Sequence, residues 1–264
     1  MEIYKTKYAM KTNYILFISF SLCIFSCTKE KPITPAPPAE KSKYEIWGIG
    51  KKTDKELSLN RDYNWYIDQK ETGKYSSINC GPTATTMAAK WYDEKFPYSV
   101  EDARSKYRPE GGWWYTNDIE SYLKLNKIPH KFIPFKTYLD IEKELSNNCI
   151  AILCLDMDII RESPNMVYRI DKFYKTTPDW GHFIIAKGFI YSDKDKFLEV
   201  YDPNSWGGKY NDGTYKGACR YYRCSDILKS ATDWWPYAII IGDNTTTKSQ
   251  NALNPANIPH QYGK

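Results

Sequence analysis

The stretch between Asn79 and Trp91 constrains the fold of this chain more than any other part of its sequence. Pro82 suits the first turn of a helix, where the backbone N–H that proline lacks would have no partner. Apolar side chains then recur at the i, i+3, i+4 and i+7 spacing of one helix face, at Ala84, Met87, Ala88 and Trp91. The pattern predicts a helix with one buried face, and it puts Cys80 at or just before the N-terminus of that helix.

A cysteine in this position has a specific chemical consequence. The unpaired N–H groups and the dipole at a helix N-terminus favour a thiolate over a thiol. A thiolate is the nucleophile that covalent catalysis by cysteine requires. Cys80 is therefore a candidate nucleophile, and a capping or core cysteine is the alternative on this segment alone.

The second element is His182, which follows a glycine and opens an apolar run typical of a strand. The chain has only two other histidines. His260 falls in a polar C-terminal segment, and His130 follows a proline in an expected loop, where we expect a surface residue. His182 is therefore the candidate general base, and a structural histidine is the alternative.

The third element is Asp202, which follows a short apolar run over 197–201 and precedes a proline that ends the strand. A polar turn over 192–196 separates this run from the strand that His182 opens, so the two should form an antiparallel hairpin. His182 and Asp202 then lie at the same edge of the sheet. A carboxylate there can orient the imidazole and stabilise its charged form.

The register of this hairpin is open from sequence alone. A tight turn would place His182 opposite a position nearer Gly207, and a longer loop would be needed to bring Asp202 opposite His182. Asn204 is therefore an alternative residue for orienting the imidazole.

Cys-Gly-Pro-Thr at a helix start, Gly-His at a strand start and Asp-Pro at a strand end together resemble papain-like cysteine peptidases. The pattern is most similar to their bacteriocin-processing branch, the double-glycine-leader type, over about residues 63–242. The resemblance implies an α+β fold. In that fold a helical part that carries the nucleophile packs on an antiparallel sheet that carries the histidine and the aspartate.

The resemblance also implies roles for individual residues. Cys80 would be the nucleophile, His182 the general base and acid, Asp202 the residue that orients His182, and Gln69 a donor to the oxyanion. A surface glutamine is the alternative for Gln69. Asn-Ser-Trp-Gly after Asp-Pro is similar to plant and lysosomal papains, whose Asn orients the histidine, and this keeps Asn204 open. The implied substrate is a peptide or amide, with no cofactor and no metal.

The segments between these motifs predict further elements. Helices are expected over 117–126 and 137–147, and strands over 149–155 and 219–225. Four cysteines lie in or beside these two strands, at Cys149, Cys154, Cys219 and Cys224. Inter-strand disulfides, a zinc site and buried small apolar side chains are the alternatives, and zinc is disfavoured because each pair would point to opposite faces of its strand.

The N-terminal residues resemble the signal of a bacterial lipoprotein. A basic start and a short apolar run end at Cys27, so residues 1–26 are expected to be cleaved and Cys27 to carry lipid. A plain signal peptide or an N-terminal anchor is the alternative. A Pro-rich tether over 27–43, a peptidase domain over 44–243 and a flexible tail over 244–264 complete the expected organisation. The expected location is the cell envelope, periplasmic or surface-exposed.

Composition narrows the function further. The formal net charge is only +5 and the charges are scattered, which argues against a nucleic-acid partner. The leading hypothesis is therefore a membrane-anchored thiol hydrolase that cleaves amide bonds through an acyl-enzyme on Cys80. An acyl or peptidyl transferase of the same fold and a catalytically silent binding module are the alternatives.

Overall fold

The computed structural model describes residues 40–245 of the chain. The expected signal peptide over 1–26, Cys27 and His260 lie outside these residues. So do most of the expected tether over 27–43 and most of the expected tail over 244–264. In the described part of the chain, no helix is both long and apolar enough to cross a membrane.

A seven-stranded sheet forms the centre of the fold, in the order β2-β7-β3-β4-β5-β6 with β1 paired to β4. All of its strand pairs are antiparallel. The strands are β1 (Thr53–Ser58), β2 (His130–Pro134), β3 (Ile150–Asp156), β4 (Gly181–Ser192), β5 (Lys196–Tyr201), β6 (Arg220–Arg223) and β7 (Tyr237–Ile241). β3 and β4 are nearly unbroken apolar runs and are buried on both faces. This is the mixed helical and antiparallel-sheet class that the sequence predicts.

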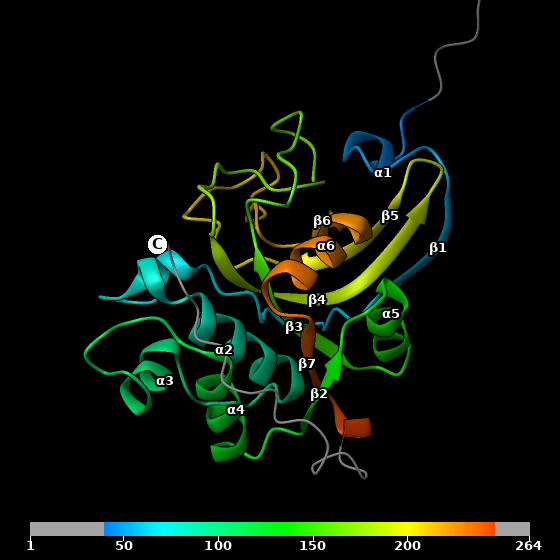
Figure 1. The fold of residues 1–264 in the computed structure, drawn as a ribbon. Coiled ribbons are helices and arrows are strands. Elements are labelled where there is room, and N and C mark those ends of the chain that lie inside the picture. Colours follow the sequence, from blue (N-terminus) through cyan, green and yellow to red (C-terminus); the bar gives the residue numbers. More distant parts are fainter. Residues whose placement is uncertain (1–39, 246–264) are drawn as a thin grey trace, which may run out of the picture. The chain divides into compact units, whose positions relative to one another are not determined.

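Helices cover the sheet from more than one side. They are α1 (Lys43–Ile46), α2 (Cys80–Tyr92), α3 (Val100–Lys106), α4 (Thr116–Leu125), α5 (Tyr138–Ser146) and α6 (Cys224–Trp234), with 3₁₀ turns η1 (Gln69–Glu71), η2 (Ser76–Ile78) and η3 (Asp243–Thr245). Figure 1 shows α2, α3 and α4 gathered together, with α2 against β4 and α6 packed on β3 and β5.

Helix α2 begins at Cys80, as its sequence predicts. The expected single buried face is wrong, however, because Thr83, Thr85 and Thr86 are as fully buried as the apolar face itself. The reason is that α2 packs against β3 and β4 as well as α3 and α4, so neighbours surround it. The helix that carries the candidate nucleophile is thereby held in the interior of the protein.

Two other predicted helices are confirmed within a residue or so of their expected ends. Helix α4 buries its predicted face at Ile119, Tyr122 and Leu123. Helix α5 begins after Thr137, which forms a capping box with Asp140.

Two expectations are wrong in their details. The predicted strand over 219–225 ends early, because β6 stops at Arg223 and Cys224 begins α6. Cys224, Ile227 and Ala231 are buried on one helix face, and this helical spacing overrides the short strand pattern. His130 is not a surface loop residue either. It is the first residue of β2, is partly buried, and its Nδ1 lies 2.7 Å from the carbonyl of Ile128.

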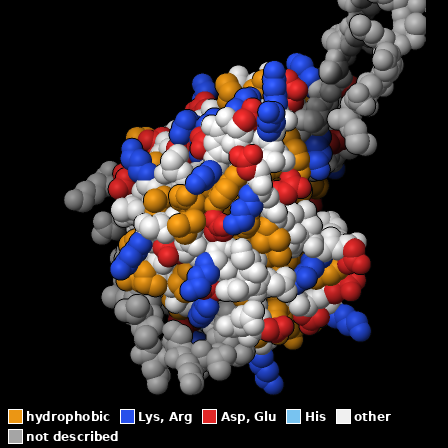
Figure 2. Space-filling model, turned by 90° about the vertical axis from the view of Figure 1, so that its right-hand side faces the viewer, with side chains coloured by type: hydrophobic (Ala, Val, Ile, Leu, Met, Phe, Trp, Pro, Cys, Tyr) orange, Lys and Arg blue, Asp and Glu red, His pale blue; other side chains and the backbone are white. Residues whose placement is uncertain are grey.

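Figure 2 views the molecule from the side on which Figure 1 shows β1 and α5. Basic and acidic side chains alternate there with apolar ones, and neither sign forms an extended region on this face. This distribution accords with the small net charge of +5.

Candidate active site

A β-bulge in the β4–β5 hairpin decides which residues share the edge of the sheet. Ala186 pairs with Val200 and Gly188 pairs with Glu199, so Lys187 is one extra residue on β4. Continued past the end of β5, this register aligns Asp202 with the residue two positions after His182. Both side chains therefore lie on the same face of the sheet, since side chains alternate along a strand.

The expected need for a longer loop is thus wrong. The turn is tight, because β4 ends at Ser192 and β5 begins at Lys196. Without the bulge, the same turn would put Asp202 one position further along, on the face opposite His182. The bulge shifts the register by that one residue and lets Asp202 reach His182 diagonally.

His182 and Asp202 form a buried pair. The Nε2 atom of His182 donates to Oδ1 of Asp202 at 2.8 Å, and the Asp202 side chain is completely buried. Asp202 accepts three further hydrogen bonds, from the Asn204 backbone N–H at 2.9 Å, the Tyr174 hydroxyl at 2.8 Å and the Tyr222 hydroxyl at 2.5 Å. Every lone-pair direction of this carboxylate therefore has a donor.

These contacts keep Asp202 ionised. Burial acts to raise the pKa of Asp202, but the charge and hydrogen bond of His182, together with Tyr222 and the Asn204 N–H, outweigh it and lower that pKa. Burial and the adjacent carboxylate raise the pKa of Tyr174 and of Tyr222 well above the usual value, so both stay neutral donors. No motif in the sequence indicates either tyrosine, since Tyr174 lies in a loop and Tyr222 on β6.

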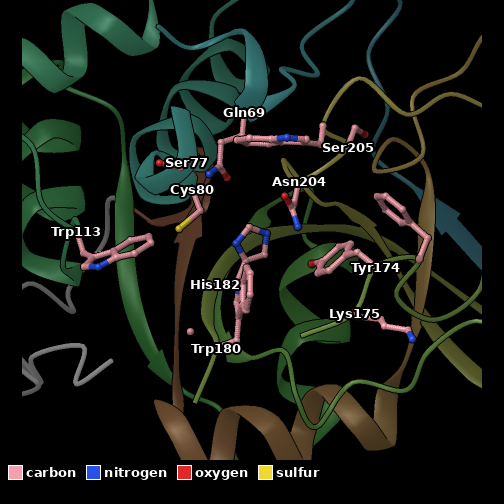
Figure 3. A pocket seen from close by; sticks show the side chains of 13 residues that line it. Gln69, Ser77, Cys80, Trp113, Tyr174, Lys175, Trp180, His182, Asn204 and Ser205 are labelled. Atoms are coloured by element: carbon pink, nitrogen blue, oxygen red, sulfur yellow. The ribbon is translucent and has the colours of Figure 1, made fainter. Parts of the chain in front are cut away.

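Cys80 meets the other side of the imidazole. Because Nε2 of His182 is bound to Asp202, Nδ1 is the ring nitrogen left for the sulfur. Cys80 is a side-chain hydrogen-bond partner of His182, and Figure 3 shows the two side chains next to each other in the cavity. Burial lowers the pKa of His182, but the charge and hydrogen bond of Asp202 and the contact with Cys80 outweigh it and raise that pKa to about 10. The site therefore favours a charged imidazolium next to the sulfur.

Gln69 lies in the same cavity wall and is not a surface residue. It begins η1, is 4% exposed, and donates from Nε2 to the carbonyl of Ser76 at 2.6 Å. Its Oε1 atom is buried without a hydrogen-bond partner among the described residues. Figure 3 shows the side chain reaching toward Cys80. The structure thus brings together all four predicted site residues: Gln69, Cys80, His182 and Asp202.

Asp68 is a further buried residue of the site that no motif in the sequence indicates. Its carboxylate accepts the backbone N–H groups of Lys70 at 3.2 Å, Trp206 at 3.0 Å and Gly207 at 2.5 Å. The Gln69 N–H also donates to the carbonyl of Pro203 at 2.8 Å. The segment that carries Gln69 is therefore fixed to the loop that follows Asp202.

Asn204, the alternative orienting residue, has a different place in the site. Its backbone N–H donates to Asp202, while Nε2 of the imidazole is bound by Asp202 itself. The Asn204 side chain lines the cavity next to the ring, as Figure 3 shows. Asp202 is thus the residue that contacts the imidazole nitrogen.

A cavity of about 440 Å³ opens over these groups. Aromatic side chains form much of its lining, including Trp113, Phe173, Tyr174, Trp180 and Trp206. Trp180 and Trp206 are 36% and 46% exposed, so apolar surface stays accessible at the rim. Such a cavity suits a ligand whose apolar groups contact the aromatic lining and thereby place a reactive polar bond next to the sulfur of Cys80.

The remaining cysteines do not combine into a further centre. None of the five cysteines of residues 40–245 forms a disulfide, and of the four beside the predicted strands only Cys219 is incompletely buried. Within this described range, no group of three or more His, Cys, Asp and Glu side chains is placed to hold a metal ion. The interpretation as small apolar side chains therefore fits Cys149, Cys154 and Cys224 best.

Comparison with known proteins finds similarity among solved structures. No protein-family model matches the chain, and no curated protein matches it. A solved structure described as a "putative C39-like peptidase from Bacillus anthracis" is similar over 73% of this chain and 100% of that chain. The sequence identity is 10% and the TM-score 0.48. Identity this low says nothing about activity, so the chemistry of the site rests on its own residues.

Proposed function

We propose that this protein is a thiol hydrolase of the cysteine peptidase type. One arrangement carries the proposal: Cys80 stands at the start of α2 in contact with an imidazole whose far nitrogen is bound by the buried carboxylate of Asp202. A nucleophile, a base and a residue that orients the base are the three parts that acyl transfer through a thiol requires.

The reaction follows from these parts. The Cys80 sulfur, with its proton held on His182, attacks the carbonyl carbon of an amide and forms a tetrahedral intermediate. The proton on His182 then passes to the leaving nitrogen as the C–N bond breaks. Water, deprotonated by His182, attacks the thioester and releases the acid, which returns the sulfur to its starting state.

The oxyanion of that intermediate needs donors next to the sulfur. The Cys80 backbone N–H is one, because the first N–H groups of a helix have no carbonyl partner one turn earlier. The amide of Gln69 is the second, since its Nε2 carries two hydrogens and Ser76 uses only one. In this assignment Gln69 stabilises the transition state and does not contribute to binding of the substrate before the reaction.

The substrate class follows from the cavity. A peptide or other amide would lie in the cavity that Trp113, Trp180 and Trp206 help to line, with its scissile carbonyl over Cys80. We propose further that the fold is papain-like and that the chain is an exported protein held on a membrane by lipid on Cys27.

The test is active-site labelling of the purified domain with a thiol-reactive peptide probe, followed by peptide mapping. Cys80 should react far faster than Cys219, the incompletely buried cysteine that serves as an internal control. Cys80→Ala should abolish hydrolysis of a peptide library, while Cys219→Ala should leave it unchanged. Equal, slow labelling of both cysteines would contradict the proposal and favour a binding module.

Hydrolysis and acyl transfer share the acyl-enzyme and differ in the acceptor. Adding a primary amine to unlabelled enzyme during turnover of a peptide substrate, and determining the masses of the products, separates them. We expect the acid as the main product at millimolar amine, and an amide as the main product would assign a transferase.

A further inference from the structure

Arg104, on α3, is buried directly behind the N-terminus of the helix that carries Cys80. The residue is 5% exposed. Nε and Nη2 donate to Oδ1 of Asn79 at 2.9 and 2.6 Å, Nη2 also donates to the carbonyl of Ile78 at 3.2 Å, and Nη1 donates to the carbonyl of Gly112 at 2.7 Å. One guanidinium therefore ties α3 to the residue before Cys80 and to the loop before Trp113.

The contact with Asn79 has an unusual effect on α2. Asn79 is the N-cap residue, and an asparagine there normally accepts an N–H from the first turn of its helix. Here its side chain makes no such bond. Its Oδ1 accepts hydrogen bonds from Arg104, and its Nδ2 donates to Thr72 at 3.0 Å. The first N–H groups of α2, at Cys80 and Gly81, are thus left without the usual side-chain cap.

The charge of Arg104 is equally unusual. All the acceptors that it contacts in the described residues are neutral oxygens. The nearby carboxylate of Asp118 is bound at 2.7 Å by Arg108. A buried cation at the positive end of a helix is costly unless a negative charge forms close by.

A thiolate on Cys80 would supply the negative charge that this environment favours. Burial lowers the pKa of Arg104, and a thiolate at Cys80 is the strongest influence in the opposite direction. The other titratable groups that Cys80 influences are His182 on β4 and Cys154 on β3, and the Cys154 thiol is neutral because burial raises its pKa. Tyr75 and Arg108 also face Arg104.

The Nη1 group of Arg104 binds the segment that leads into the cavity wall. The carbonyl that it binds belongs to Gly112, which precedes Trp113 in the cavity wall. Gly111 and Gly112 have φ values of +97° and +92°, a conformation that favours glycine. The guanidinium therefore fixes a loop whose backbone has little steric restraint of its own.

We propose that Arg104 is a positioning residue for the proposed nucleophile. It draws the Asn79 side chain away from α2, so that the helix N-terminus and the guanidinium charge stay available to the thiolate and the oxyanion, and it holds the Trp113 wall. This inference rests on the thiol chemistry proposed for Cys80 and deepens it.

The experiment compares Arg104→Met and Arg104→Lys with Arg61→Met as a matched control. Arg61 contacts the other end of the same helix, where its Nε donates to the carbonyl of Trp91 at 3.1 Å. Alkylation of Cys80 by iodoacetate, which is negatively charged, and by iodoacetamide, which is neutral, is followed by peptide mapping. Thermal unfolding reports whether each variant is folded, and peptide turnover is measured alongside.

The ratio of the two alkylation rates distinguishes loss of the Arg104 charge from a general disturbance of the site. A general disturbance would slow the reactions with both reagents alike and leave the ratio unchanged. In Arg104→Met we expect the iodoacetate-to-iodoacetamide ratio to fall about fivefold, as expected for losing one favourable charge near a helix end. Arg61→Met should keep the wild-type ratio. Arg104→Lys should restore it, but its peptide turnover should stay well below wild type, since one ammonium cannot span Asn79 and Gly112.

An unchanged ratio in a folded Arg104→Met variant would overturn the inference, even if its turnover falls. If that variant does not fold, Arg104→Lys decides, because wild-type turnover in it would also overturn the inference. Failure of the thiol chemistry itself looks different: wild-type Cys80 would then react no faster than Cys219.

Discussion

The Nε2 atom of His182 and the Oδ1 atom of Asp202 are 2.8 Å apart, in a place where the carboxylate is wholly buried. A buried carboxylate is stable only when donors surround it, and here one of the donors is the proposed catalytic base. The protonation of His182 is therefore tied to the charge on Asp202. Several outcomes of mutation and of pH follow from this pair and its supports.

Replacing Asp202 with Asn removes the charge and keeps the shape. We expect the pKa of His182 to fall well below its value of about 10, because the carboxylate is the main influence that raises it against burial. Turnover should fall by about 10²- to 10⁴-fold, as for other residues that orient a catalytic histidine. An NMR titration of the His182 ring checks the first effect, with Asp195→Asn on the surface turn as the control. An unmoved His182 titration would contradict the pairing.

The pair also makes stability depend on pH. Since the pKa of His182 is raised from 6.5 to about 10, its contribution is complete below about 6.5 and is lost as the pH rises through 10. Since the pKa of Asp202 is lowered from 3.8, its contribution is present above 3.8 and is lost at more acidic pH.

Chemical unfolding of the wild type and of His182→Gln at several pH values measures this dependence. The difference in unfolding free energy between the two proteins should be large at pH 6 and should shrink above pH 10. A difference that does not change between these pH values would show that the histidine is not charged in the folded protein.

Tyr222→Phe removes one donor from the buried carboxylate without changing the packing of the ring. We expect a loss of about 1–3 kcal/mol in unfolding free energy, the usual cost of leaving one buried acceptor unsatisfied. Denaturant titration measures it. Tyr98→Phe, at a tyrosine that is 46% exposed, should cost nearly nothing. Equal effects at the two positions would mean that the Tyr222 hydroxyl does not support Asp202.

Lys187 stands at the bulge and forms a buried ion pair with Glu199, with Nζ and Oε1 2.5 Å apart. Lys187→Met should cost about 3–5 kcal/mol, because it leaves a buried carboxylate without its cation. Adding Glu199→Gln to that variant should recover part of the loss. A double-mutant cycle by denaturant titration decides, and simple additivity of the two changes would contradict the coupling.

Gln69→Ala tests the oxyanion donor separately from the nucleophile. Peptide turnover should fall by about 10²- to 10³-fold, the usual effect of removing one oxyanion donor. Alkylation of Cys80 by iodoacetamide forms no oxyanion, so its rate should stay near that of the wild type. A parallel fall of both rates would instead assign Gln69 to the support of Cys80.

Local patterns in the sequence were enough to predict the parts of the fold that carry the site. The helical spacing after Cys80 and the strand after His182 reflect burial of apolar side chains, which repeats along the chain and is visible in one dimension. The helix face was misjudged because a single period cannot reveal how many neighbours surround α2. Cys80, His182 and Asp202 were found for the same reason, since each lies at the end of such an element, whereas Gln69 was indicated by the family resemblance alone.

The rest of the site depends on contacts between distant segments, which no local pattern contains. The bulge at Lys187 adds one residue to a strand that reads as continuous, and it alone decides which face Asp202 occupies. Tyr174, Tyr222 and Arg104 are ordinary residues in sequence and matter only through the partners that folding gives them. The role of a buried polar group can be recognised only when its hydrogen-bond donors and acceptors are known.

The base and its carboxylate lie on one hairpin, 20 residues apart, whereas the sulfur arrives on a helix from much earlier in the chain. Short loops close readily, and distant segments meet later. A folding copy can therefore assemble His182 with Asp202 while Cys80 is still an ordinary thiol. Cys80 then becomes a reactive nucleophile only in the folded protein, so incompletely folded chains do not react with one another.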